Sequence, residues 1–76
     1  MRLSYNKLWK LLIDKGMNKT DLRKQAGISS SSLAKLGKNE NVTTDVLLRI
    51  CTALNVELNE IVETVRDEQT TEQKKN

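Results

Sequence analysis

Apolar residues recur at every third or fourth position through much of the chain, which is the spacing of one face of an α-helix. In the first such segment, Gly16 follows Lys15 and offers a residue that tolerates the left-handed conformation of a helix end. Ser4 stands just before the segment and is a candidate N-cap. We therefore predict a first helix that ends near Lys15. Its inward-facing residues are Tyr5, Leu8, Leu11 and Leu12.

Two short helices separated by one glycine are predicted next. Asn18 is a good N-cap for a helix over residues 19–26. The inward-facing residues of this helix are Leu22 and Ala26. Gly27 stops it, and Ser29 can accept hydrogen bonds from the free amides at the start of another helix. Two capped helices that meet at a glycine predict a helix-turn-helix.

The third helix is predicted to have two different faces. At about 100° per residue, Leu33 and Leu36 share one side, which we expect to pack inward. The opposite side is polar, slim and basic, and it consists of Ser30, Ser31, Ala34, Lys35 and Lys38. Either Gly37 ends this helix or Asn39 ends it later, and we favour Asn39. Short side chains at a helix N-terminus allow close approach to a DNA groove, and the helix dipole favours a phosphate there.

Two further helices are predicted in the second half of the chain. Thr43 caps a fourth helix, Asn55 ends it in the left-handed conformation, and a short fifth helix follows over residues 56–65. The apolar residues of these helices are Val46, Leu47, Ile50, Cys51 and Leu54, then Val56, Leu58, Ile61, Val62 and Val65. Residues 67–76 contain no apolar residue, so we expect a polar tail without stable structure. The pattern predicts an all-α domain over residues 1–66, with five helices and no strand.

Length and composition agree with this reading. A chain of 76 residues suffices for one small domain and is too short for two. Proline is absent and glycine is scarce, which favours helices with short connections. The longest apolar run, residues 11–13, is too short to cross a bilayer, and no secretory signal pattern precedes it, so we expect a cytoplasmic protein.

Charge is divided unevenly along the chain. Residues 1–38 contain nine Lys or Arg and two Asp, which gives +7, whereas residues 39–76 contain four bases and eight acids, which gives −4. A basic half is typical of proteins that bind a polyanion, because lysines that neutralise phosphates release condensed counterions. The alternative is that these lysines only solvate the helices.

The residue types present disfavour catalysis and metal binding. The chain has no histidine to act as a general base near neutral pH, and no glycine-rich phosphate loop. Its single cysteine, Cys51, has no partner for a disulfide or a zinc site. We therefore expect neither an enzyme nor a bound metal or cofactor, and no small-molecule ligand is apparent.

Taken together, the sequence resembles the Cro and phage-repressor type of helix-turn-helix domain, also called the XRE family, over roughly residues 5–62. The segments that carry the resemblance are residues 17–22, 26–29, 32–36 and 47–56. It implies a compact five-helix, lambda-repressor-like domain in which the second and third helices form the helix-turn-helix. It also implies a transcriptional regulator, most often a repressor of bacterial, phage or mobile-element origin, that binds double-stranded operator DNA as a symmetric homodimer.

The resemblance further implies which residues contact DNA. Base contacts are expected from Ser30, Ser31 and Lys35. Backbone contacts are expected from Asn18, Lys19, Ser29, Lys38, Asn39 and Asn41. Without the family, the same surface is selected because it combines a helix N-terminus with convergent lysines.

Some residues keep a second interpretation at this point. Serines stand where many relatives have Gln or Arg, so bases would be read through Lys35, through water or through DNA shape. The same feature favours an alternative function, an adaptor or antitoxin-like module that binds protein and binds DNA weakly or not at all.

Serines at residues 29–32 also permit a weakly helical linker. Trp9 is expected to close an edge of the core, and Val62 and Val65 fit either the core or a dimer seam.

Overall fold

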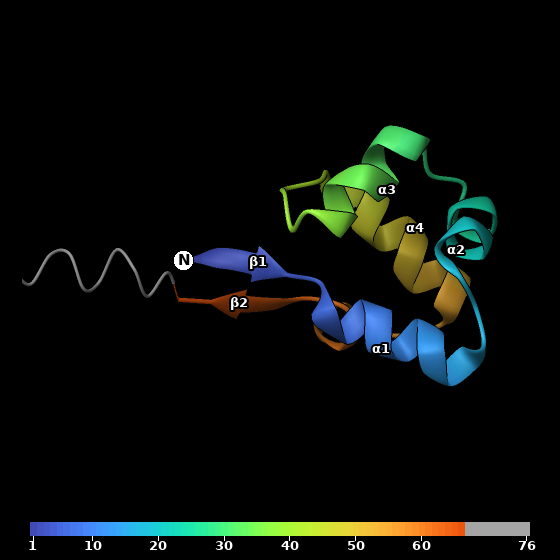
Figure 1. Cartoon of the computed structure of the whole chain (residues 1–76), viewed down its shortest axis with the longest axis horizontal. Helices are drawn as coiled ribbons and strands as arrows, with labels where there is room; N and C mark the ends of the chain where they lie inside the picture. The colour runs from blue at the N-terminus through green and yellow to red at the C-terminus, as the bar shows by residue number, and fades with distance from the viewer. Residues whose placement is uncertain (67–76) are drawn as a thin grey trace, which may run out of the picture.

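Four α-helices and a two-stranded sheet make up the computed structural model, which describes residues 1–66 (Figure 1). The two strands lie side by side and project away from the helices (Figure 1). The elements in chain order are β1 (Arg2–Ser4), α1 (Asn6–Lys15), α2 (Lys19–Ala26), α3 (Ser30–Gly37), α4 (Thr44–Leu54), the 3₁₀ turn η1 (Leu58–Glu60) and β2 (Glu63–Val65). The polar tail predicted for residues 67–76 lies outside the described residues.

The three N-caps predicted for α2, α3 and α4 are confirmed. Asn18 caps α2 in a capping box: its Oδ1 accepts from the Asp21 amide at 2.8 Å, and the Asn18 amide donates to the Asp21 carboxylate at 3.1 Å. Ser29 and Thr43 accept from the amide three residues later, at 3.1 and 3.3 Å. Each cap satisfies a backbone donor that has no partner within its own helix. Local sequence therefore fixes where these three helices begin.

The start of α1 differs from the prediction. Ser4 belongs to β1 and is almost fully buried, and Tyr5 takes the N-cap position without a side-chain cap. The Ser4 hydroxyl instead accepts a hydrogen bond from the Asn6 amide at 3.3 Å. Serine was a plausible cap from sequence alone, but pairing with β2 holds its backbone in a strand.

Left-handed residues follow the helices where the sequence predicts them, with one shift. Gly16, Gly27 and Asn55 have φ of 69°, 69° and 57°. The last residue of α3 is Gly37, so the favoured end at Asn39 is wrong by two residues. Asn39 nevertheless takes φ 57°, and the Glu40 amide donates to the Lys35 carbonyl at 2.9 Å. In such a turn the left-handed residue stands two positions beyond the last helical residue, which explains the shift.

The predicted fifth helix is absent from the described residues, and the prediction of no strand is wrong. Residues 58–60 form only the turn η1, in which the Glu57 amide donates to the Glu60 carboxylate at 2.8 Å. Residues 63–65 form β2, antiparallel to β1 in the register Arg2↔Val65, Leu3↔Thr64 and Ser4↔Glu63. A three-residue strand is too short to show the alternation of apolar and polar residues that is typical of a strand. Its partner lies about sixty residues away, so the apolar spacing alone fitted a helix. The fold is thus predominantly helical, with four α-helices in residues 1–66.

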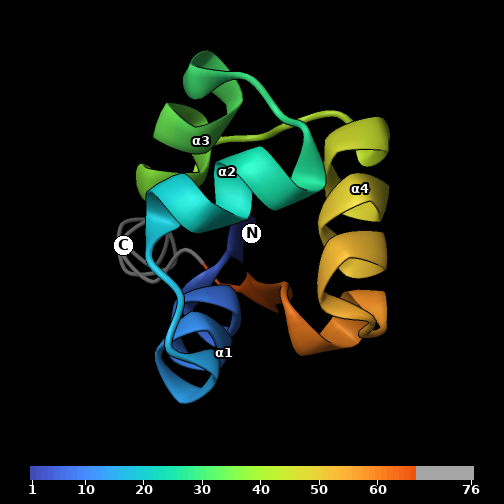
Figure 2. The ribbon, with the colours of Figure 1, turned by 90° about the vertical axis from the view of Figure 1, so that its right-hand side faces the viewer.

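The core lies where α1, α2, α3 and α4 face one another. Figure 2 shows α2 lying between α3 and α4, against both of which it packs. The buried apolar residues are Tyr5, Leu8, Leu12, Leu22, Ala26, Ile28, Leu36, Leu47, Ile50, Leu54 and Ile61. Cys51 is half-buried against this core. Burial raises the pKa of its thiol, and the carboxylates of Glu57 and Glu60 raise that pKa further.

Tyr5 connects the N-terminal segment to the turn after α3. Its fully buried side chain donates a hydrogen bond from Oη to the Glu40 carbonyl at 2.7 Å. Its amide donates to Oδ1 of Asn39 at 3.2 Å. Burial raises the pKa of the Tyr5 phenol, because the charged phenolate is disfavoured away from water. These contacts fix the end of α3 relative to α1.

Within residues 1–66, no helix is long and apolar enough to cross a membrane.

Candidate nucleic-acid interface

The outer face of α3 is exposed along its whole length. Ser30, Ser31 and Lys35 are exposed, whereas Leu36 is fully buried and Leu33 is half-buried on the opposite side. The two-faced helix predicted from the sequence is therefore confirmed. Leu36 belongs to the hydrophobic core and anchors the helix there, so the polar side of α3 faces outward.

A chain of serine hydroxyls marks the N-terminus of α3. Besides capping the helix, the Ser29 hydroxyl donates to the Ser32 hydroxyl at 3.1 Å and lies within 3.1 Å of the Ser31 hydroxyl. The four serines therefore form the capped first turn of a helix, and the linker interpretation is wrong. The free amides of this turn and the helix dipole create a partial positive charge suited to an anion.

Lysines border this face on two sides. Lys38 is exposed at the end of α3, and Lys19 is exposed at the start of α2. The Lys19 ammonium lies 4.5 Å from the centroid of the Trp9 ring. It also lies 3.9 Å from the point that a Cβ at Gly37 would occupy. The N-terminus of α2 and the C-terminus of α3 are thus neighbours, as Figure 2 shows.

The three asparagines expected to contact the DNA backbone differ in their exposure and in their hydrogen bonds. Asn41 is exposed in the loop between α3 and α4. Asn39 is half-buried, and its Oδ1 faces the Tyr5 amide rather than solvent. The Oδ1 of Asn18 is occupied by its capping bond to Asp21. The Oδ1 atoms of Asn39 and Asn18 therefore have structural roles, while Asn18, Lys19, Lys38 and Asn41 are all exposed at the surface.

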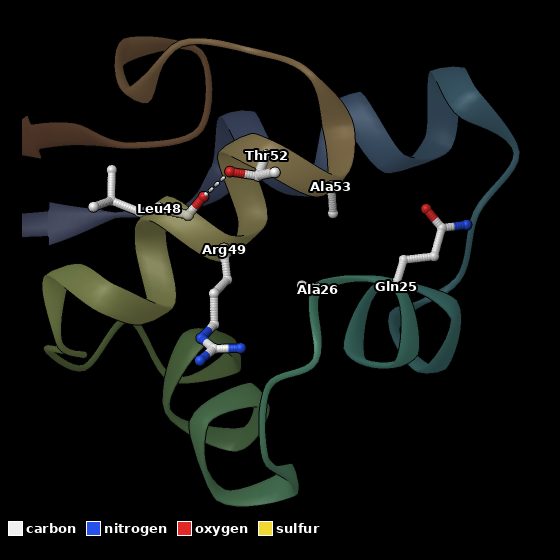
Figure 3. Close-up of a pocket in the computed structure, with 6 residues that line it drawn as sticks. All are labelled: Gln25, Ala26, Leu48, Arg49, Thr52 and Ala53. Carbon is white, nitrogen blue, oxygen red and sulfur yellow. Dashed lines mark hydrogen bonds between the residues drawn. The ribbon is translucent and has the colours of Figure 1, made fainter.

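Two features of this region escaped sequence reasoning. Trp9 packs against the core edge as predicted. Its ring also forms a cation–π contact with the Lys19 ammonium, which no spacing in the sequence indicates. Arg49 extends from α4 (Figure 3), and its Nη1 lies 3.6 Å from the Cβ position at Gly27. Arg49 also pairs with Asp45 at 2.8 Å on an exposed surface. An exposed pair of this kind adds little stability.

A shallow groove of about 310 Å³ lies beside Arg49 between α2 and α4. Figure 3 shows the residues that line it, which are Gln25, Ala26, Leu48, Arg49, Thr52 and Ala53. Leu48 is 60% exposed there, and the Thr52 hydroxyl donates back to the Leu48 carbonyl at 2.9 Å. In the part of the chain that the structure describes, no cluster of His, Cys, Asp or Glu is arranged to hold a metal ion.

A capped bracing helix, a left-handed glycine turn and a second capped helix with an exposed polar face define a helix-turn-helix domain. Residues 7–67 match the model of the Cro/C1-type helix-turn-helix DNA-binding domain. The chain belongs to this family, and the resemblance drawn from its sequence is confirmed.

A solved structure supports the same assignment. The chain is similar to the transcriptional regulator VanUg in its crystal form II, with 56% sequence identity and a TM-score of 0.84. The similarity covers 87% of this chain and 88% of that one. No curated protein sequence matches the chain.

Proposed function

We propose that this protein is a sequence-specific regulator of transcription that inserts α3 into the major groove of operator DNA. The observation that carries the proposal is the exposed face of α3, which joins a capped helix N-terminus to Ser30, Ser31 and Lys35. Membership of a DNA-binding family and the similarity to a transcriptional regulator support it.

In this proposal the residues divide into two groups by chemistry. Lys35 reads a base edge, since an ammonium can donate to both O6 and N7 of guanine. The short serines allow the helix to approach closely and read bases directly or through water. Lys19, Lys38, Asn41 and the first turn of α3 hold phosphates, which position the domain without reading sequence.

We further propose that the protein acts as a symmetric homodimer and represses transcription by occupying its operator. Two copies would place their α3 helices in successive major grooves on one side of the duplex, about 34 Å apart. An operator of two inverted half-sites follows from this symmetry.

The test is selection of bound sequences from a random duplex pool, followed by titration of the selected duplex at several salt concentrations. We expect an enriched palindrome and a steep loss of affinity with salt. Replacing Lys35 with Ala should weaken binding to the selected duplex by about 1 to 3 kcal/mol and relax specificity at one base position.

Two further lysine variants separate phosphate contacts from general charge. Lys38→Gln should weaken all sequences alike and reduce the salt slope by about one unit. Lys10→Gln removes the same charge beside Asn59 and Glu60, away from α3, and should leave binding nearly unchanged. A wild-type chain with little affinity for duplex DNA at any salt concentration would contradict the proposal and favour the adaptor function.

A further inference from the structure

The Lys19 ammonium lies at a junction of three helices. Lys19 is the first residue of α2, its ammonium stands over the Trp9 ring of α1, and it approaches the last residue of α3, Gly37. Figure 2 shows the same junction, with the start of α2 beside the end of α3 and above α1. A surface lysine ordinarily samples many rotamers, so a position defined by three elements calls for a physical cause.

Two attractions restrain the ammonium at this point. The face of an indole ring carries negative electrostatic potential, and 4.5 Å is well within the range of a cation–π interaction. The C-terminal end of α3 presents carbonyl groups with partial negative charge, which also favours a cation. The side chain starts from a fixed backbone, because the capping box of Asn18 and Asp21 holds the first turn of α2.

The ring itself is held firmly enough to act as a platform. Trp9 is half-buried, packs against the hydrophobic core, and lines a shallow apolar depression of about 300 Å³ with Leu12, Ile13 and Met17. Gly37 leaves space on the other side, since a Cβ there would already stand in van der Waals contact with the ammonium. A longer side chain at residue 37 would extend from that point into the space the ammonium occupies.

We propose that Trp9 is a positioning residue for DNA binding, which holds the Lys19 ammonium at the edge of the α3 face where a phosphate is bound. The inference rests on the proposed function. Lys19 remains exposed, so its free N–H groups can still donate to a phosphate oxygen while the ring lies on its other side. Part of the side-chain entropy that a free lysine loses on binding is lost here during folding, which favours association.

A double-mutant cycle on a random-sequence duplex at low salt tests this coupling. Trp9→Leu keeps an apolar side chain but removes the π face. It should weaken binding about two- to five-fold, because the unrestrained Lys19 side chain then has to be ordered when the phosphate binds. Trp9→Phe keeps an aromatic face and should retain most of the affinity. In a chain that already carries Lys19→Gln, Trp9→Leu should cause no further loss. An equal loss in both backgrounds would overturn the proposal and indicate a packing effect.

Fluorescence gives a second readout that does not depend on a Trp9 variant. Trp9 is the only tryptophan, so its emission reports on this junction alone. Saturating duplex DNA should change the emission of the wild type and change that of Lys19→Gln much less. The same change in both proteins would overturn the positioning role even if Trp9→Leu fails to fold.

The two proposals fail in different ways. Wild-type protein that binds duplex DNA with a steep salt dependence, together with additive effects of Trp9 and Lys19, leaves the proposed function intact and overturns this inference. Wild-type protein that does not bind duplex DNA overturns both.

Discussion

The helix-turn-helix and the paired strands β1 and β2 are stabilised in opposite ways. Residues 18–37 are shaped by signals that act over a few positions: two N-caps that bond three residues ahead and a glycine between the helices. In contrast, β1 and β2 form only by pairing with each other, which places Arg2 opposite Val65. The candidate DNA-binding surface is therefore encoded locally, whereas the closure of the domain depends on a contact between segments far apart in the sequence.

The two regions are not independent, because Tyr5 joins them. It follows β1 directly, and its hydroxyl and amide bond to the backbone of Glu40 and the side chain of Asn39. The pairing of β1 with β2 therefore supports the turn that follows α3. This link is where the comparison can be tested most directly.

The largest expected effect comes from truncating the core of the helix-turn-helix. Leu22 is fully buried on α2, so Leu22→Ala should lower the free energy of unfolding by about 3 kcal/mol through lost burial and a cavity. Val65 is only half-buried on β2, and Val65→Ala should lower it by less than about 1 kcal/mol. Urea denaturation followed by circular dichroism measures both. Equal losses would show that the pairing of β1 with β2 matters as much as the helical core.

An intermediate effect is expected when the link between the regions is cut. Tyr5→Phe removes the hydrogen bond to Glu40 and leaves a carbonyl without its partner, which should cost about 1 to 2 kcal/mol. Because the pKa of Tyr5 is raised in the folded protein, the stability it contributes is lost as pH rises above the ordinary tyrosine value near 10.

Titration of both proteins with urea from neutral pH to pH 11 checks this prediction. The difference in stability between wild type and Tyr5→Phe should therefore narrow at the alkaline end. A variant as stable as the wild type at neutral pH would mean that the Glu40 carbonyl finds another partner at no cost.

Effects of opposite sign are expected at two glycines, and the smaller of them is at Gly37. Gly27 has φ +69°, and a methyl group there would stand 3.6 Å from Nη1 of Arg49, an ordinary contact. Gly27→Ala should therefore cost about 1 to 2 kcal/mol, through backbone conformation alone. Gly37 does not have positive φ, so Gly37→Ala should stabilise the protein by up to about 1 kcal/mol.

The measurement is thermal unfolding of the two glycine variants in parallel, in which each variant serves as the control for the other. Losses of similar size at both positions would mean that the end of α3 needs glycine for a reason other than backbone freedom.

Much of the candidate site was predictable because its determinants are close together in sequence. The caps at Asn18 and Ser29, the turn at Gly27 and the outward orientation of Lys35 all follow from spacing within a few residues. The contacts that Lys35 and its neighbours make with DNA stay predictions. The position of the Lys19 ammonium over the Trp9 ring was not predictable, since the two residues lie on different helices.

The errors at the two strands and at the start of α1 have one physical origin. Val62 and Val65 show an apolar spacing that fits a helix, and Ser4 is a residue type that often caps one. Both readings consider only neighbours in sequence, whereas a β-pair obtains its hydrogen bonds from a distant segment. Local preference was weak at these positions, so the pairing partner decided the outcome.

The capped helices, the glycine turn and the polar outer side of α3 follow from the amino-acid sequence alone, because helix hydrogen bonds and caps join residues at most a few positions apart. Packing of distant segments was needed to pair residues 2–4 with residues 63–65, to turn Asn39 toward Tyr5 and to place Lys19 over Trp9. Each of these depends on which segments the packed core brings within contact distance, and periodicity along the chain contains no information about that distance.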